Sequence, residues 1–492
     1  PRLPEPPAMP RLPLLVALTV LARLEVFAVP VATDTAVDTL TATIGSTPQD
    51  LPLIRSNFAS FSVEVPTAPT YVNMTAYATL YKQLRDVPNS SGEGPRLRVG
   101  GNSADESWWN PGHAKPLPPN VTYDVQPSDL VAIAAFVKDV NGSVVFDSDM
   151  RPHAPDWAVE YAQAIDTTIG WDRVAGFEVG NEVDLFPGRI KPSDYEYTDY
   201  LDEFRSYVAA LSTAVPALKG RIQGSTMCCK SLWYKQIPEY VQEFGHAGGT
   251  GALTTLSFHH YPLSTCGGQA IDLSELMQNS ASQGIAQLVA PFAQACRAAG
   301  VDFWIGEGNS VSCGGASGIS DTFGAALWAL DIMLEMASVG AHGWNFHGSY
   351  RGAYTPIAFP DVKNISSAPV VRPLFYGMLA FSRAAAAHNG AAIMPVKIDS
   401  TNPMVHLFAL RGNSDAVTVV VLHKDVNATG PAHISVASER RLTGVAKLEW
   451  LTVPAAHSGL ERLTATSGLT LGGLTYDGTA DGTPRGTPSH ED

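Results

Sequence analysis

The segment RVAGFEVGNE, residues 173–182, has the composition of a buried strand and ends on two residues that can take part in chemistry. Its β-branched and aromatic residues are typical of strands, and its last two residues are Asn181 and Glu182. A second segment of this kind, VDFWIGE (301–307), ends on Glu307. Two strands that both end on a carboxylate indicate a fold in which strand ends meet at one site.

Strand-like segments and helical patterns alternate along the chain around these two segments. The strand-like segments are 57–65, 95–101, 143–150, 173–182, 221–227, 254–262, 301–307 and 343–348. Apolar residues at helical spacing occupy 127–140, 154–165, 192–211 and 320–337. Eight alternations over about 300 residues predict an α/β fold, a (β/α)8 TIM barrel. A doubly wound open sheet fits less well, because no Gly-rich dinucleotide or phosphate loop follows a strand.

The texture of the sequence divides the chain into parts. We expect the barrel over 51–385 and, because short alternating runs follow, a C-terminal antiparallel β-sandwich domain over 386–475. Residues 29–50 have a similar texture and are predicted to pair with the sandwich. The last segment, 476–492, is rich in Gly, Pro and Thr and is predicted to be disordered.

Residues 1–28 resemble a secretory signal peptide. Met9 and the cation Arg11 precede an apolar stretch over 12–21, and small-residue spacing predicts cleavage after Ala28. An apolar N-terminal helix or a membrane anchor is the alternative. Asn-x-Ser/Thr sequons, which only an extracytoplasmic protein can use, support secretion; they lie at Asn73, Asn89, Asn120, Asn141, Asn364 and Asn427. We therefore expect a secreted, extracellular glycoprotein.

Composition and charge exclude some classes of partner. The chain has 492 residues, 45% of them hydrophobic, which is enough for a large core. Its formal net charge is −15, with 47 acidic and 32 basic residues. This balance disfavours binding to nucleic acid or to an anionic membrane.

The five cysteines are too few for a disulfide scaffold. Cys266 and Cys313 both fall in Gly-rich loops and could form a bridge, whereas Cys228, Cys229 and Cys296 are predicted to be buried thiols. Since no Cys or His spacing matches a zinc site, we expect no metal and no cofactor.

Glu182 and Glu307 would end the fourth and seventh strands of the predicted barrel. Catalytic residues of this fold lie at the carboxyl ends of the strands, around one mouth. A single Glu at a strand end is most often solvated or ion-paired. Two that converge across a barrel mouth point instead to cleavage of a glycosidic bond.

Four segments resemble glycoside hydrolase family 79, which includes β-glucuronidases and heparanases. They are LRVGGNSADESWWNP (97–111), FEVGNEVD (177–184), WIGEGNSVSCGG (304–315) and SDTFGAALWALDIMLEMASVGAHGWNFHG (320–348). The likeness spans about 60 to 380. It implies a retaining mechanism in which Glu182 is the general acid/base and Glu307 the nucleophile.

The resemblance also implies roles for supporting residues. Asn181 would bind the sugar 2-hydroxyl, Tyr261 would donate a hydrogen bond to the nucleophile, and Glu64 would bind sugar hydroxyls. The uronate carboxylate would lie against the loop 310–315, whose candidate residues are Ser312, Cys313 and Gly314. Gly residues there would allow a close backbone approach.

Some features around this site leave alternatives open. Some relatives carry a Tyr near Ser312, so Tyr354 or Tyr350 is a candidate replacement, and Arg351 could add charge. Arg98 is expected to point towards the buried carboxylates. At most one of the adjacent His259 and His260 can line the pocket.

The sequence therefore predicts a secreted, retaining exo-β-glucuronidase that acts on glucuronic-acid-terminated glycans or glucuronides. An endo-β-glucuronidase of the heparanase type is one alternative, and a non-catalytic glycan-binding barrel protein is another. Neither nucleic acid nor, after removal of the signal, a membrane is an expected partner.

Overall fold

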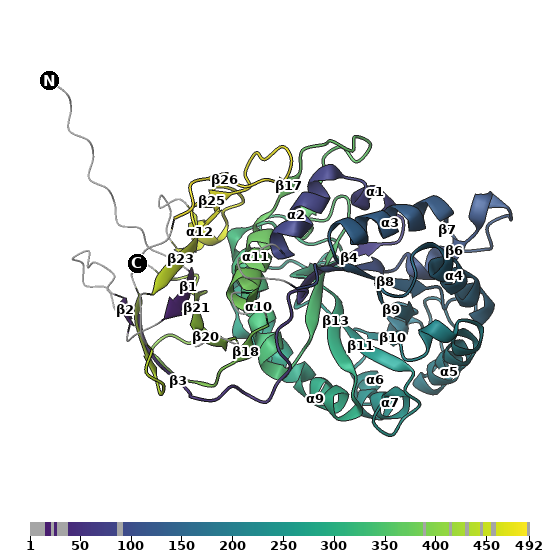
Figure 1. Cartoon of the computed structure of the whole chain (residues 1–492), viewed down its shortest axis with the longest axis horizontal. Helices are drawn as coiled ribbons and strands as arrows, with labels where there is room; N and C mark the ends of the chain where they lie inside the picture. The colour runs from purple at the N-terminus through teal and green to yellow at the C-terminus, as the bar shows by residue number, and fades with distance from the viewer. Residues whose placement is uncertain are drawn as a thin grey trace.

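A closed barrel of eight parallel strands forms the centre of the computed structural model of the chain (Figure 1). The structure describes residues 15–20, 24–26, 38–85, 92–386, 390–412, 416–428, 432–442, 446–453 and 459–489. The barrel strands are β4 (Ala59–Glu64), β5 (Arg96–Gly100), β8 (Ser143–Ser148), β9 (Val174–Val179), β10 (Ile222–Met227), β11 (Leu253–His260), β13 (Asp302–Gly308) and β15 (Gly343–Gly348). Their order around the barrel follows the chain, and the predicted barrel is confirmed.

The helices that the sequence predicts between these strands are present. The longer helices are α2 (Thr75–Arg85), α3 (Pro127–Asp139), α4 (Pro155–Thr168), α5 (Tyr197–Ala214), α7 (Ile237–Phe244), α9 (Gln283–Ala299), α10 (Phe323–Val339) and α11 (Pro373–Ala386). Every residue of β8, β10 and β15 is buried, because one face points into the barrel and the other packs on this outer layer of helices. Within the described part of the chain, no helix combines the length and the apolar character needed to cross a membrane.

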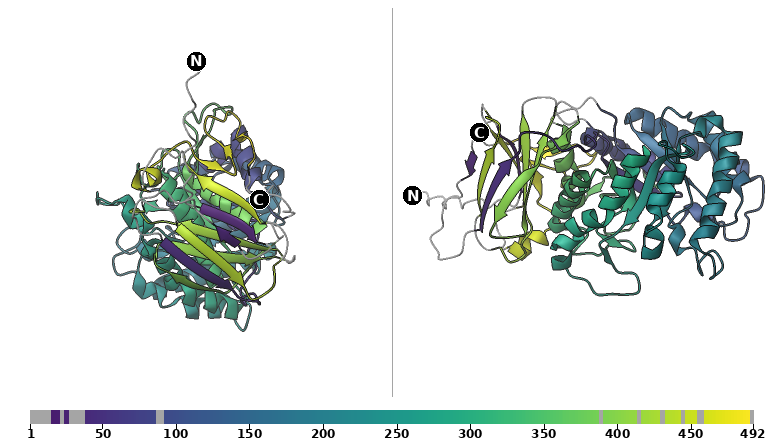
Figure 2. Two further views of the ribbon diagram at one scale, coloured as in Figure 1. Left: turned by 90° about the vertical axis from the view of Figure 1, so that its left-hand side faces the viewer. Right: turned by 90° about the horizontal axis from the view of Figure 1, so that it is seen from below.

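Two further sheets lie beside the barrel, on the side of α10 and α11 (Figures 1 and 2). The larger sheet has the order β18 (Ala392–Ile393), β20 (Val405–Arg411), β21 (Val417–His423), β1 (Leu15–Val20), β23 (Lys447–Thr452), β24 (Thr470–Leu471), β25 (Leu474–Thr475) and β26 (Arg485–Gly486). The smaller has the order β19 (Val396–Ser400), β3 (Asp38–Ile44), β22 (Ala432–Ser438) and β2 (Leu24–Val26).

Side chains alternate between two cores along the larger sheet. Val419 and Val421 of β21 face the smaller sheet and pack in one apolar cluster with Leu40 of β3. Val420 and Leu422 point the other way and belong to the same cluster as the barrel helices. Because successive side chains of a strand point to opposite faces, the larger sheet packs against the smaller sheet on one face and against the barrel helices on the other. The sheets differ from the predicted antiparallel sandwich in one place, because β22 pairs with β3 in parallel.

The interface between the barrel and the sheets carries a buried charged cluster. Almost every residue of α10 is buried. Its Asp331 accepts hydrogen bonds from Lys424 Nζ at 2.6 Å and pairs with His406 Nδ1 at 2.8 Å. Burial would raise the pKa of Asp331, but the charges of Lys424 and His406 lower it below its usual range.

Both ends of the chain contribute to these sheets. Strands β1 and β2 fall within the segment in which we expect a signal peptide. In the structure, β1 pairs with β21 and β23, and β2 pairs with β22. Cleavage after Ala28 stays a prediction. The C-terminal segment differs from the expectation of disorder. Its strand β26 pairs with β25, and Thr479 Oγ1 donates to the Thr483 carbonyl. Residues 490–492 lie outside the described part.

Candidate active site

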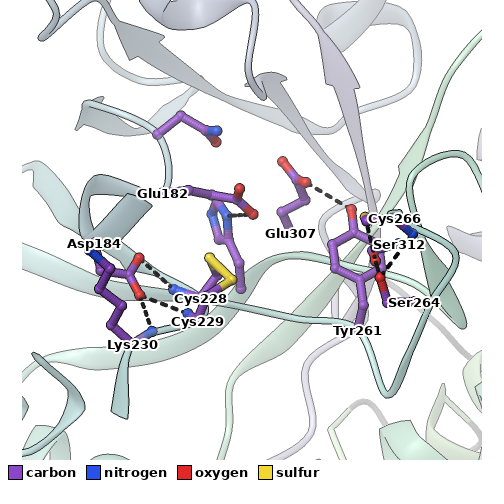
Figure 3. Close-up of a disulfide and its surroundings, with 12 residues drawn as sticks. Glu182, Asp184, Cys228, Cys229, Lys230, Tyr261, Ser264, Cys266, Glu307 and Ser312 are labelled. Carbon is purple, nitrogen blue, oxygen red and sulfur yellow. Dashed lines mark hydrogen bonds and ion pairs between the residues drawn. A yellow bond between two sulfur atoms is a disulfide. The ribbon is translucent and has the colours of Figure 1, made fainter. Parts of the chain in front are cut away.

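Glu182 and Glu307 meet at the carboxyl-end mouth of the barrel. Glu182 follows β9 and Glu307 lies near the end of β13, so both side chains point into one space (Figure 3). One oxygen of each carboxylate and one ring nitrogen of His259 lie within 4.8 Å of one another. Glu182 has a φ of 50°, a left-handed conformation that is uncommon outside Gly and that is concentrated at functional sites.

Glu307 is held in its ionised form by its neighbours. Tyr261 Oη donates to its Oε1 at 2.8 Å, and Arg98 Nη1 donates to its Oε2 at 2.7 Å. Burial alone would raise the pKa of Glu307. The charges of His347, His259 and Arg98 and the hydrogen bond from Tyr261 outweigh burial and lower this pKa to about 2. This is the state that a carboxylate nucleophile requires.

Arg98 organises the floor of the site from a fully buried position. Besides Glu307, its guanidinium donates to Glu178 Oε1 at 2.6 Å, to Asp147 Oδ2 at 3.2 Å and to Asn181 Oδ1 at 2.9 Å. Burial lowers the pKa of Arg98, but these carboxylates raise it well above its usual range, so the charge is fixed. The position of Arg98 agrees with the sequence-based expectation.

Sequence reasoning did not find Glu178, Asp147 or His347. All three side chains are buried, and His347 Nδ1 lies 3.6 Å from Glu307 Oε2. The available signal was a charged residue inside an apolar strand, as with Glu178 in GFEV. Such a residue needs a buried partner.

His259 lies between the two carboxylates. It is fully buried, neither ring nitrogen has a hydrogen-bond partner, and its Nδ1 is 3.6 Å from Glu182 Oε1. His259, Glu182 and Glu307 also have the donor types of a metal site. Both oxygens of Glu307 already accept hydrogen bonds, from Tyr261 and Arg98, which favours the carboxylates as a catalytic pair.

Asn181 and Glu64 lie in the same site. Asn181 Oδ1 accepts from Arg98, and its Nδ2 lies 3.4 Å from Asn102 Oδ1. Glu64 Oε2 accepts from the backbone N–H of Ser103 at 2.9 Å. Burial would raise the pKa of Glu64, but His347 and Ser103 lower it. Both groups are therefore oriented by the protein itself.

The loop 310–315 begins next to Glu307 and contains three consecutive residues in the left-handed region. The φ values are 61° at Cys313, 94° at Gly314 and 81° at Gly315. A Cβ at Gly315 would lie 2.5 Å from the Tyr354 backbone N, whereas a Cβ at Gly314 would meet nothing within 4 Å. Gly315 therefore packs closely against the protein, whereas the position of Gly314 is open; the approach of the uronate to this loop stays a prediction.

Tyr354 is the aromatic residue that faces the catalytic site after β15. Its ring stacks on Tyr261, with centroids 6.3 Å apart, and lies 5.9 Å from the His347 ring. Tyr350, the other candidate, instead donates its hydroxyl to the Pro66 carbonyl at 3.2 Å. Arg351 is exposed.

The structure has two disulfides near the carboxylate pair, Cys228–Cys229 and Cys266–Cys313, of which Figure 3 shows the first. The Cys266–Cys313 bridge considered from the sequence is confirmed, and it joins the loop after β11 to the loop 310–315. The expectation that Cys228 and Cys229 are buried thiols is wrong, because these neighbours form a disulfide. Cys296 is a buried free thiol, as predicted.

The Cys266–Cys313 bridge is reinforced by polar contacts. Short strands β12 (Leu263–Ser264) and β14 (Val311–Ser312) pair in parallel, and Ser312 Oγ donates to Ser264 Oγ at 2.8 Å. Ser312 is therefore engaged with the neighbouring loop, so its hydroxyl is partly used within the protein.

The chain is similar in sequence and structure to known glycoside hydrolases. No protein family model matches the chain. A β-glucuronidase of Aspergillus niger is 22% identical over 466 residues, covering 88% of this chain and 84% of the relative. A β-glucuronidase of Neurospora crassa is 23% identical over 486 residues, covering 86% and 84%.

Among solved structures, the chain is similar to a 4-O-α-L-rhamnosyl-β-D-glucuronidase from Fusarium oxysporum, with a TM-score of 0.73 and 19% identity over 92% of this chain and 95% of that one. A family 51 arabinofuranosidase from Xanthomonas axonopodis pv. citri follows, with a TM-score of 0.61 and 15% identity over the same shares. These structures share the fold. The barrel, the carboxylate pair and the sequence relatives together support a glycoside hydrolase.

Proposed function

We propose that this protein is a retaining exo-β-glucuronidase of glycoside hydrolase family 79, acting on glucuronides or on glycans that end in glucuronic acid. The observation that carries the proposal is the pair of Glu182 and Glu307. One oxygen of Glu182 lies within 4.8 Å of one oxygen of Glu307. This close approach supports a retaining arrangement, with carboxyl groups about 5–5.5 Å apart, over an inverting one, with about 6.5–9.5 Å.

In the first step, Glu307 attacks the anomeric carbon and Glu182 protonates the leaving oxygen. Tyr261 and Arg98 keep Glu307 charged before the attack, and its low pKa of about 2 makes it ionised at any physiological pH. A covalent glycosyl-enzyme results. In the second step, Glu182 takes a proton from water, which attacks the same carbon and releases the sugar with retention.

The uronate carboxylate would lie against the loop 310–315. Successive backbone N–H groups in left-handed conformation form a concavity suited to an anion, and φ is positive at Cys313, Gly314 and Gly315. The hydroxyl of Tyr354 would add a donor from the facing side. Burial, and then the charge of Glu307, raises the pKa of Tyr354, so this hydroxyl keeps its proton.

Glucuronide specificity is also supported by the two sequence relatives, both of which are β-glucuronidases. The Fusarium oxysporum neighbour acts on glucuronic acid that carries rhamnose at O4. A substituent at O4 of the glucuronic acid is therefore a reasonable variant to include among test substrates.

Secretion belongs to the same proposal. All the sequon Asn residues in the described part are exposed: Asn73, Asn120, Asn141, Asn364 and Asn427. Asn89 lies outside that part. Two disulfides suit an oxidising compartment.

Hydrolysis of 4-nitrophenyl β-glucuronide, compared with the matching β-glucoside and β-galactoside, tests the proposed substrate. We expect a clear preference for the glucuronide and a β-configured first product by NMR. An α product would contradict retention, and preference for a neutral sugar would contradict the uronate assignment. Release of internal fragments from a glucuronic-acid-containing polysaccharide would favour the endo-acting alternative.

A further inference from the structure

The disulfide between Cys228 and Cys229 lies at the end of β10, beside the turn that carries Glu182. Figure 3 shows this disulfide and Asp184 on the Glu182 side of the site, whereas Tyr261, Ser312 and Cys266 lie on the Glu307 side. Cys228 is buried and Cys229 is exposed. The pair is therefore held by the fold on one side and open to solvent on the other.

Asp184 holds the cysteine pair in place. Its fully buried carboxylate accepts backbone N–H bonds from Cys228 at 3.0 Å, Cys229 at 2.7 Å and Lys230 at 2.6 Å. Asp184 comes two residues after Glu182, so the position of the disulfide is set relative to the acid/base. Bonds from three N–H groups to one carboxylate are strong and directional.

The two sides of the catalytic pair have different tasks in the proposed reaction. The nucleophile side, with the loop 310–315, binds the sugar that becomes covalently attached. The acid/base has to reach the leaving oxygen, so the leaving group lies on the Glu182 side. That is the side on which Cys228 and Cys229 present their sulfur atoms.

We propose that the Cys228–Cys229 disulfide is a platform of the leaving-group subsite, against which an aromatic aglycone or the apolar face of a leaving sugar packs. This inference rests on the proposed function. A ring closed by adjacent cysteines offers sulfur and methylene groups but no hydrogen-bond donor from its side chains. Polarisable sulfur makes favourable contacts with aromatic rings, of about 0.3–1.5 kcal/mol.

The test compares two substrates that share the sugar and differ in the leaving group, 4-nitrophenyl β-glucuronide and methyl β-glucuronide. Their kcat/KM values are measured for the wild type and for Cys228→Ser/Cys229→Ser. The platform predicts that the variant loses about two- to tenfold on the aryl substrate, the range that such a sulfur contact gives. The value for the methyl substrate, which depends more heavily on acid catalysis by Glu182, stays within about twofold.

Cys296→Ala is the matched control, because Cys296 is a buried thiol on α9, away from the mouth, and this variant should not change the ratio between substrates. If the double variant does not fold, a phosphine reductant is applied to folded Cys266→Ser/Cys313→Ser, in which Cys228–Cys229 is the remaining disulfide.

Equal losses on both substrates would overturn the inference, since the cysteine turn would then support Glu182 and not the leaving group. The inference would also be overturned if the variant had the kcat/KM values of the wild type on both the aryl and the methyl glucuronide. If the wild type hydrolyses neither glucuronide, the proposed function itself fails, and the leaving-group platform falls with it.

Discussion

Glu307 and Glu182 should fail in different ways when each is replaced, because they act in different steps. Glu307→Gln removes the nucleophile and is expected to reduce turnover of 4-nitrophenyl β-glucuronide by about a thousandfold or more. Glu182→Ala should still form the glycosyl-enzyme from this activated substrate, since its leaving group needs no proton, and should slow the second step by about 10²- to 10⁴-fold.

Burst kinetics and azide rescue measure this difference. Glu182→Ala should show a burst of nitrophenol and, with azide, should yield a β-glycosyl azide, because azide needs no general base. Recovery of an α-glycosyl azide from Glu182→Ala would mean that Glu182 is not the acid/base of a retaining enzyme.

Gly315 gives a second prediction at the scale of one residue. Gly314 and Gly315 both have positive φ, so an Ala costs about 1 kcal/mol of backbone energy at either position. Only at Gly315 would the added Cβ collide with the Tyr354 backbone. We expect Gly315→Ala to reduce kcat/KM for the glucuronide at least tenfold more than for the glucoside. Gly318→Ala is the matched control, because Gly318 lies outside the loop 310–315, also has a positive φ, and has space for a Cβ.

Equal losses on glucuronide and glucoside in Gly315→Ala would show that the loop positions Glu307 and does not select the acid. A loss of acid preference in Arg351→Ala alone would instead assign selectivity to a charged side chain.

Residues at the ends of strands and the buried Arg98 could be predicted from the sequence, whereas the other buried groups of the site were missed. Glu182, Glu307 and Tyr261 directly follow apolar segments, so the pattern that predicts the barrel strands also places these residues at the barrel mouth. Asp184 was missed because its partners are backbone N–H groups more than 40 residues away. Because backbone N–H groups are common to nearly all residues, the sequence contains no basic residue that would mark the partner of such a carboxylate.

Among the elements, the loop 310–315 depends on its tie to the loop after β11. The Cys266–Cys313 disulfide closes a loop of 47 residues. Opening a loop of that length gives the unfolded chain more conformational freedom and lowers the free energy of unfolding by up to about 4 kcal/mol at room temperature. We expect Cys266→Ser/Cys313→Ser to raise KM for the glucuronide and to lower the midpoint of thermal unfolding, with kcat less affected.

Cys296→Ala again serves as the control for loss of a thiol. Ratios of kcat/KM for glucuronide and glucoside, together with thermal unfolding, provide the two measurements. Unchanged glucuronide selectivity in a destabilised double variant would limit the disulfide to a role in stability.

The barrel strands were predictable as elements because each is a short apolar run bounded by turn residues. The parallel pairing of β22 with β3 was not, since alternation of apolar and polar residues has the same period in both orientations. The C-terminal segment lacks apolar runs, and its order comes from contacts: Gly482 packs against the Ala76 carbonyl of α2. Composition alone does not report such contacts.

For the whole molecule, the buried cluster at α10 predicts how stability depends on pH. Burial, and then the charge of Asp331, raises the pKa of Glu335 to about 7. The unfolded chain releases this proton near pH 4.5, whereas the folded chain keeps it until about pH 7. Glu335 therefore contributes on the order of 2–3 kcal/mol to the free energy of unfolding below pH 4.5. This contribution is lost as the pH rises to 7.

Unfolding midpoints measured from pH 4.5 to 8 test this prediction. Asp105 and Asp149 have pKa values raised by burial to about 7 and about 8, so they add to the same decline in stability. Glu335→Gln keeps the shape of the side chain without the titration and should flatten the curve. A Gln variant with the slope of the wild type would contradict the assignment to Glu335.

The burial of α10 between the barrel and the sheets also decides how the chain can be cut and recombined. Truncation after α11 would leave the carboxylate of Asp331 without Lys424 and His406 and would expose the apolar face that Val420 and Leu422 cover. We therefore expect that the barrel does not fold stably without the sheets and that the sheets cannot be replaced by another domain in a fusion protein. Engineering that needs a new segment has a better position in the exposed stretch around Asn364, where an insertion leaves that shared core closed.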